Sequence, residues 1–249
     1  MIHNNQILLE AKNLSLEIPL VDKIDQSLKK TFLRSMTGGK IARNKNKTVI
    51  KALSNINLKI NKGERIGLIG HNGAGKSSFI KIISGIYEAT SGHLICQEKA
   101  FPMLQKSFIV SDSLTGIDEA KARYLLINRN LNNFSIFLED IKTFSGLGDF
   151  ISLPLRTYST GMTARLIFSL LTYHSHNFLA LDEAIGTGDT DFYEKAEKRL
   201  ENFLKNTGSL IIASHSPTLL TQFCDRGIVF SKGTIAYDGK LKDALNFYD

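Results

Sequence analysis

Short apolar runs alternate with amphipathic segments along much of the chain. Residues 178–181 and 210–213 carry only apolar side chains and are followed by polar residues. Buried parallel strands have this character because both faces of their sheet are covered. A third run, residues 65–69, leads into a glycine-rich segment, after which residues 79–86 have the spacing of a mostly buried helix. The pattern predicts an α/β fold whose strand ends carry a site.

The first sixty residues show strand patterns that are interrupted by a basic segment. Residues 7–9 and 14–18 predict short strands, and residues 50–60 increasingly alternate as in a half-buried strand. Residues 24–36 place apolar side chains four positions apart, which predicts an amphipathic helix. Residues 38–46 are polar and contain two glycines, which predicts a loop.

Composition adds a constraint on partners. The chain has 249 residues, of which 43% are hydrophobic and 22% charged, as in ordinary globular proteins. No apolar run reaches the roughly 18 residues that a bilayer-spanning helix needs. The net charge is +7, but residues 22–51 alone carry nine basic and two acidic side chains, so the rest is nearly neutral. This segment is either a solvated loop or a helix facing anionic lipid headgroups.

The glycine-rich segment matches a known phosphate-binding motif. Residues 70–77 fit G-x-x-x-x-G-K-[ST] between a predicted strand and a predicted helix, the context that this motif requires. Its glycines let backbone N–H groups surround phosphates, Lys76 is expected to neutralise the β and γ phosphates, and the Ser77 hydroxyl to hold Mg²⁺. The predicted ATP-binding residues here are Gly70, His71, Asn72, Gly73, Ala74, Gly75, Lys76, Ser77 and Ser78.

Polar residues follow the two later apolar runs. Asp182 and Glu183 come directly after residues 178–181, and His215 comes shortly after residues 210–213. An acidic pair after a strand is by itself more often a helix N-cap. Together with the upstream loop, the pair predicts Asp182 as a Mg²⁺ ligand and Glu183 as the general base for the attacking water. His215 is predicted to sense the γ-phosphate.

The order of these motifs resembles that of ABC-type ATPases. The segment YSTGM at 158–162 is similar to the Leu-Ser-Gly-Gly-Gln signature of that family, and Ser159 precedes Asp182 by 23 residues, as in the family. The resemblance implies that Ser159 and Gly161 bind ATP held by a second copy of the chain. It also implies that Asp189, seven residues after Asp182, reaches across the dimer.

Two further roles come from the same resemblance. Gln105 stands near the position of the family's glutamine, which would make it a catalytic residue and a further Mg²⁺ ligand. The residue that contacts adenine stays open, because the basic segment lies where the family has an aromatic side chain. Phe32 or an aliphatic side chain are the alternatives.

The form of the signature resembles one branch, the ATPases that export O-antigen, capsular or teichoic-acid polymers. It implies one ABC ATP-binding domain over residues 1–249, with an α/β phosphate-loop (RecA-like) core and an N-terminal antiparallel β region. A helical subdomain is expected at about 115–160 and a basic insertion at about 22–51.

The same resemblance implies an ATP hydrolase with ATP and Mg²⁺ as cofactors. It would work as a homodimer with two copies of a membrane permease, peripheral on the cytoplasmic face of the inner membrane, exporting a lipid-linked polysaccharide. No nucleic acid partner is expected. A soluble ABC ATPase acting on nucleic acid or ribosomes is the alternative that the net charge suggests, and an importer ATPase would share every catalytic residue.

Overall fold

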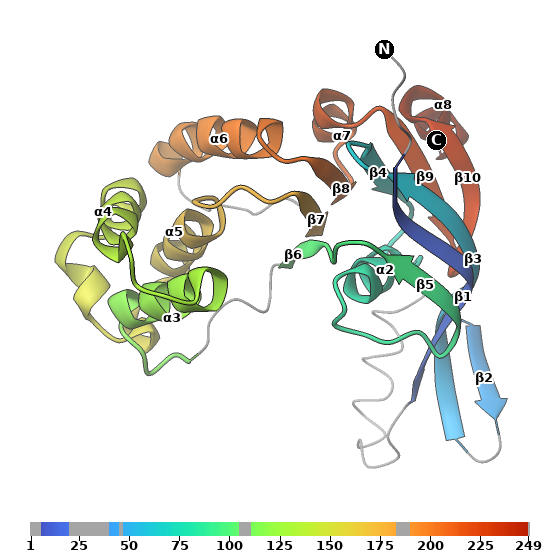
Figure 1. The fold of residues 1–249 in the computed structure, drawn as a ribbon, viewed down its shortest axis with the longest axis horizontal. Coiled ribbons are helices and arrows are strands. Elements are labelled where there is room, and N and C mark those ends of the chain that lie inside the picture. Colours follow the sequence, from blue (N-terminus) through green and yellow to red (C-terminus); the bar gives the residue numbers. More distant parts are fainter. Residues whose placement is uncertain (1–5, 20–39, 45–46, 105–110, 183–189, 249) are drawn as a thin grey trace. The chain divides into compact units, whose positions relative to one another are not determined.

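The computed structural model describes residues 6–19, 40–44, 47–104, 111–182 and 190–248 (Figure 1). These residues form two compact units. The first consists of the described residues within 1–103, 176–183 and 207–249, and the second of those within 104–175 and 184–206. The predicted helix over residues 24–36 and most of the basic segment lie outside the described residues.

A four-stranded antiparallel sheet opens the first unit, with the strand order β2-β3-β1-β5. Its strands are β1 (Ile7–Pro19), β2 (Lys40–Asn44), β3 (Lys47–Asn61) and β5 (Ser91–Cys96). The two short strands predicted at the start are one strand, β1, whose register against β3 shifts beside Asn13. Asn13 has a φ of 50°, and such a local irregularity breaks the alternation of side chains on which the sequence prediction relied.

The loop predicted for residues 38–46 is partly wrong. Residues Lys40–Asn44 form β2, which pairs with β3 from Lys40 opposite Lys51 to Asn44 opposite Lys47. A polar strand at the edge of a sheet has no apolar alternation to reveal it, because its stability comes from backbone hydrogen bonds to its neighbour.

A six-stranded sheet carries the core of the first unit, in the order β10-β9-β4-β8-β7-β6. Its strands are β4 (Arg65–Ile69), β6 (Phe101–Leu104), β7 (Phe178–Asp182), β8 (Ser209–Ala213), β9 (Arg226–Ser231) and β10 (Thr234–Lys240). The strands β4, β7, β8 and β9 run parallel, and β7 and β8 are almost wholly buried. The α/β fold class with an N-terminal antiparallel region is therefore confirmed.

Helices pack on both faces of this sheet. They are α2 (Lys76–Ile83), α7 (Pro217–Phe223) and α8 (Leu241–Tyr248). Phe79 of α2 packs on Phe230 of β9, with ring centroids 5.6 Å apart. The side of β4 at Gly67 instead faces Leu220 of α7 and Leu241 of α8.

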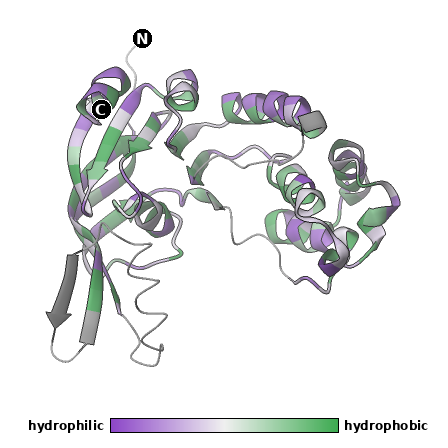
Figure 2. Cartoon of the chain, turned by 180° about the vertical axis from the view of Figure 1, so that it is seen from behind, coloured by the Kyte–Doolittle hydropathy of each residue, from purple (hydrophilic) through white to green (hydrophobic). Residues whose placement is uncertain are grey.

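The second unit is helical. It contains α3 (Gly116–Asn128), α4 (Phe134–Ser145), the 3-10 turns η1 (Gly148–Ser152) and η2 (Leu155–Thr157), α5 (Thr160–Leu171) and α6 (Thr190–Lys205). Buried side chains of α3, α4 and α5, among them Phe137, Ile141 and Leu166, form its main core. Helix α6 is mostly hydrophilic and contributes a separate small contact through Phe192 and Ala196 (Figure 2).

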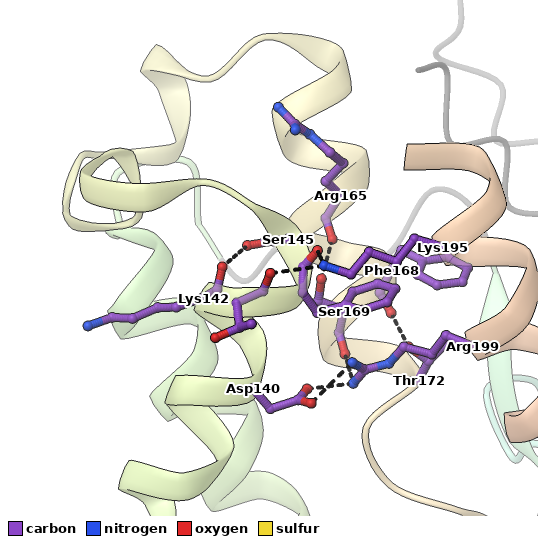
Figure 3. A network of polar contacts seen from close by, with 11 residues as sticks. Asp140, Lys142, Ser145, Arg165, Phe168, Ser169, Thr172, Lys195 and Arg199 are labelled. Carbon is purple, nitrogen blue, oxygen red and sulfur yellow. Dashed lines mark hydrogen bonds and ion pairs between the residues drawn. The ribbon is translucent and has the colours of Figure 1, made fainter. Parts of the chain in front are cut away.

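Hydrogen bonds of one arginine connect α6 with α4 and with the end of α5 (Figure 3). The Arg199 guanidinium of α6 donates to both carboxylate oxygens of Asp140 in α4, at 3.2 and 2.6 Å, and to the Thr172 hydroxyl after α5, at 2.9 Å. Lys195 donates to the carbonyls of Thr143 and Phe144 near the end of α4. Hydrogen bonds to charged groups contribute roughly 1.5–3 kcal/mol, more than the roughly 0–1 kcal/mol of an exposed ion pair.

Among the residues that the structure describes, no helix is both long and apolar enough to cross a membrane.

Candidate functional site

The glycine-rich loop lies between β4 and α2, at the carboxyl end of the parallel strands. Its path depends on two glycines. Gly70 and Gly75 have φ angles of 144° and 116°, which side chains with a Cβ rarely adopt. A Cβ at Gly70 would lie 2.4 Å from the carbonyl oxygen of Phe230, and one at Gly75 would lie 2.9 Å from Leu53. Any larger residue would therefore displace the loop.

Lys76 and Ser77 open α2 directly after Gly75. Lys76 is buried, with a relative exposure of 7%. Its ammonium group donates to the carbonyl oxygens of Gly70 and His71, so a positive charge is held inside the curve of the loop. Ser77 is exposed at the start of the helix, where the helix dipole favours anions.

Three parallel strands end at the same level beside this loop. Asp182 of β7 pairs with Ala213 of β8, and Ala213 pairs with Leu68 of β4. Because of this register, Asp182 lines the same cleft as the loop. His215, two residues past β8, places Nε2 3.0 Å from Oδ1 of Asn72 in the loop. Of the residues that the sequence predicted for hydrolysis, the described ones, Asp182 and His215, therefore both lie beside the loop.

The cleft has a volume of about 240 Å³ and extends beyond the loop. Its further lining includes Ile18, Ile50, Ala52, Lys81 and Tyr87, which sequence reasoning did not assign to the site. Ile18 and Ile50 are direct partners in the pairing of β1 with β3, and most of the basic segment lies between them in the sequence. Register between distant strands has no local signal in the sequence, so these residues could not be found there.

The segment YSTGM at 158–162 belongs to the second unit, where it starts α5. Ser159 is the N-cap of this helix, and its hydroxyl oxygen accepts from the Met162 N–H at 3.2 Å. Tyr158 donates to the carbonyl of Phe150 at 2.8 Å, and burial raises the pKa of its phenol. Ser159 is exposed, so the positive end of α5 faces solvent.

Three predicted site residues lie outside the described residues. They are Gln105, Glu183 and Asp189. In the sequence, Glu183 directly follows Asp182, the last residue of β7. Asp189 directly precedes the first residue of α6.

A parallel sheet with a phosphate loop between a strand and a helix, and an acidic residue at the end of another strand, defines a phosphate-loop nucleotide hydrolase. Comparison with known proteins narrows this class. Residues 53–186 match the family described as ABC transporter. The chain belongs to this family and is an ATP hydrolase of the ABC type.

Two of the similar curated proteins carry names that assign them to polymer export. The chain is 36% identical over 225 residues to the O-antigen export system ATP-binding protein RfbE of Yersinia enterocolitica. The aligned region covers 90% of this chain and 94% of that protein. It is 34% identical to the teichoic acids export ATP-binding protein TagH of Enterococcus faecalis, over 79% of this chain but only 44% of that protein.

The fold has solved counterparts. A dimeric ATP-binding cassette in a post-hydrolysis state, bound to ADP and phosphate, aligns with a TM-score of 0.66 and 17% identity, over 94% of this chain and 98% of that one. The match confirms the ABC ATPase fold.

Proposed function

We propose that this chain is the ATP-hydrolysing subunit of an ABC transporter that exports a lipid-linked polysaccharide. The observation that carries the hydrolytic part is that Lys76, Ser77 and Asp182 line one and the same cleft. The export part is supported by the relatives, whose names assign them to O-antigen and teichoic acid export.

The loop residues Gly70 to Ser78 hold the triphosphate in this proposal. The Ser77 hydroxyl and the Asp182 carboxylate line one cleft, and such oxygen donors suit Mg²⁺. Gln105 would be a further ligand. When bound, the ion supplies positive charge to the phosphate oxygens.

The chain's own residues then divide the work. Glu183 orients the attacking water and takes its proton, while Lys76 stabilises charge that develops on the phosphates. His215, whose ring nitrogen contacts Asn72, responds to the presence of the γ-phosphate.

Two copies form the working unit. Ser159 and Gly161 stand at the exposed start of α5, and a helix start binds anions. In the proposal, this helix start contacts the γ-phosphate of ATP held by the loop of the other copy, and Asp189 contributes across the same interface. ATP binding closes the pair, hydrolysis opens it, and two copies of a permease move accordingly at the cytoplasmic face of the inner membrane.

Purification from native membranes tests this assignment. A tagged chain is expected to co-purify with an integral membrane protein, and its deletion should leave lipid-linked polysaccharide on the cytoplasmic side. Co-purification with RNA or DNA instead would favour the soluble ABC ATPase. Loss of uptake of a solute, with polysaccharide export intact, would favour an importer.

The base of ATP is expected to rest against the aliphatic wall of the cleft at Ile18 and Ile50. The chain contains no tryptophan, so Ile18→Trp introduces a single indole fluorophore. Stacking on the base should quench its emission when ATP binds and tighten binding about threefold to tenfold, since aromatic pairs contribute about 0.5–1.5 kcal/mol. Fluorescence titration measures both.

Ile95→Trp is the matched control for this titration, because Ile95 lies on β5 with an exposed fraction of 59%. Its emission should not respond to ATP. Unchanged emission of the Ile18→Trp variant at saturating ATP would place the base elsewhere.

A further inference from the structure

The C-terminal helix α8 lies unusually close to the strands that carry the phosphate loop. Gly227 of β9 and Gly67 of β4 face this helix, and a Cβ at Gly227 would lie only 2.4 Å from the Cβ of Ala244. Leu241 and Ala244 are buried, with exposed fractions of 5% and 0%. Because both strands lack a side chain here, packing on the backbone determines the position of the helix.

The end of α8 reaches the phosphate loop. The hydroxyl of Tyr248 lies 3.0 Å from Nδ1 of His71, and the two rings are in contact, with centroids 5.1 Å apart. His71 is the second residue of the loop and lies directly after Gly70, the first residue past β4. A side chain of α8 thus contacts the loop that follows β4, one of the strands on which α8 packs.

The next loop residue is held from another element. Asn72 contacts His215, which follows β8, at 3.0 Å. Two consecutive loop residues, His71 and Asn72, are therefore each restrained by a side chain from elsewhere in the first unit. Ordering a side chain on binding costs conformational entropy, so restraint before binding lowers that cost.

We propose that Tyr248 is a positioning residue of the ATP site, which orders His71 and thereby preorganises the phosphate loop. The inference rests on the proposed role of this loop, and it adds a role for α8 that catalysis alone does not require. A shift of α8 would reach the loop through the Tyr248–His71 contact.

Equilibrium ATP binding, measured by calorimetry without Mg²⁺ to prevent hydrolysis, tests the proposal. Tyr248→Phe keeps the ring and removes the hydrogen bond, and it should weaken ATP binding on the order of threefold. Tyr248→Ala removes the ring contact as well, and the loss should reach roughly tenfold. The Michaelis constant for ATP should rise accordingly while kcat stays near the wild-type value, since the filled loop is unchanged.

Phe247→Ala is the matched control. Phe247 is the neighbouring residue of α8, and its ring stacks on Tyr237 at 5.3 Å. This variant should bind ATP as the wild type does. Equal melting temperatures of Tyr248→Phe and the wild type would separate a local effect from a loss of folding.

A double-mutant cycle with His71→Ala decides whether the effect passes through His71. In that background, Tyr248→Phe should change ATP affinity no further. Wild-type affinity in Tyr248→Phe, or an equal loss in the His71→Ala background, would overturn the proposal. If Lys76→Ala also bound ATP normally, the role of the loop itself would be wrong, which is a different failure.

Discussion

Replacing Lys76 by alanine is expected to lower ATP turnover about 10²–10³-fold, the usual cost of removing one preorganised group that stabilises charge in a transition state. Lys76 is nearly buried, and its ammonium group is held by the carbonyls of Gly70 and His71. The ammonium group therefore has a fixed position before any phosphate binds. A water molecule that replaced it in the alanine variant would not be held in the same position. Steady-state phosphate release at saturating ATP measures the effect.

Lys81→Ala serves as the matched control. Lys81 lines the same cleft one turn further along α2, and its ammonium group lies over the ring of Tyr87 at 5.2 Å. If only the total positive charge of the cleft mattered, both variants would lose similar activity. We expect Lys81→Ala to retain turnover within a few-fold of the wild type, because its charge is not held by the loop. Equal losses would contradict the role given to Lys76.

The parts of the fold that were predictable are those whose burial is complete. The strands β7 and β8 are buried on both faces, so their apolar runs are continuous and short. The same holds for β4, where the strand and the following glycines locate the loop. Asp182 and His215 could be placed near that loop because the carboxyl ends of parallel strands meet at one edge of a sheet.

The parts that were not predictable depend on pairing between distant segments. The long strand β1 was read as two because its register shifts near Asn13. The strand β2 was read as a loop because it is short and three of its five residues are polar. The contact of Tyr248 with His71 joins residues 177 positions apart. This contact depends on Gly67 and Gly227, which allow α8 to pack closely on β4 and β9. The spacing of glycines in a sequence does not show which helix will pack on them.

The remaining site assignment came from family resemblance. Ser159 was placed by its signature, and the structure shows it as the N-cap of α5 with its backbone at the helix start. In the proposal, the start of α5 binds ATP held by the phosphate loop of the other copy, so the test of this contact uses the dimer. Glu183 was assigned differently, from its place after Asp182 together with the upstream phosphate loop, and it lies outside the described residues.

Glu183→Gln is expected to lower turnover about 10²–10⁴-fold, the range that a positioned general base contributes. Glutamine has nearly the same shape as glutamate but cannot take a proton from the attacking water. ATP binding should be retained, because Lys76, Ser77 and Asp182 are intact. The variant should therefore accumulate as a dimer with ATP trapped at both sites, measurable by light scattering together with the nucleotide content of the dimer.

Asp182→Asn separates this role from that of the neighbouring carboxylate. Asp182 ends β7 and lines the cleft with Ser77, so its loss should weaken Mg²⁺-dependent ATP binding and prevent the trapped dimer. The two variants thus stop turnover for different reasons, one after the dimer closes and one before. Wild-type turnover in Glu183→Gln would remove Glu183 as the base, whereas a monomeric Glu183→Gln variant that still binds ATP would contradict the head-to-tail pairing through Ser159.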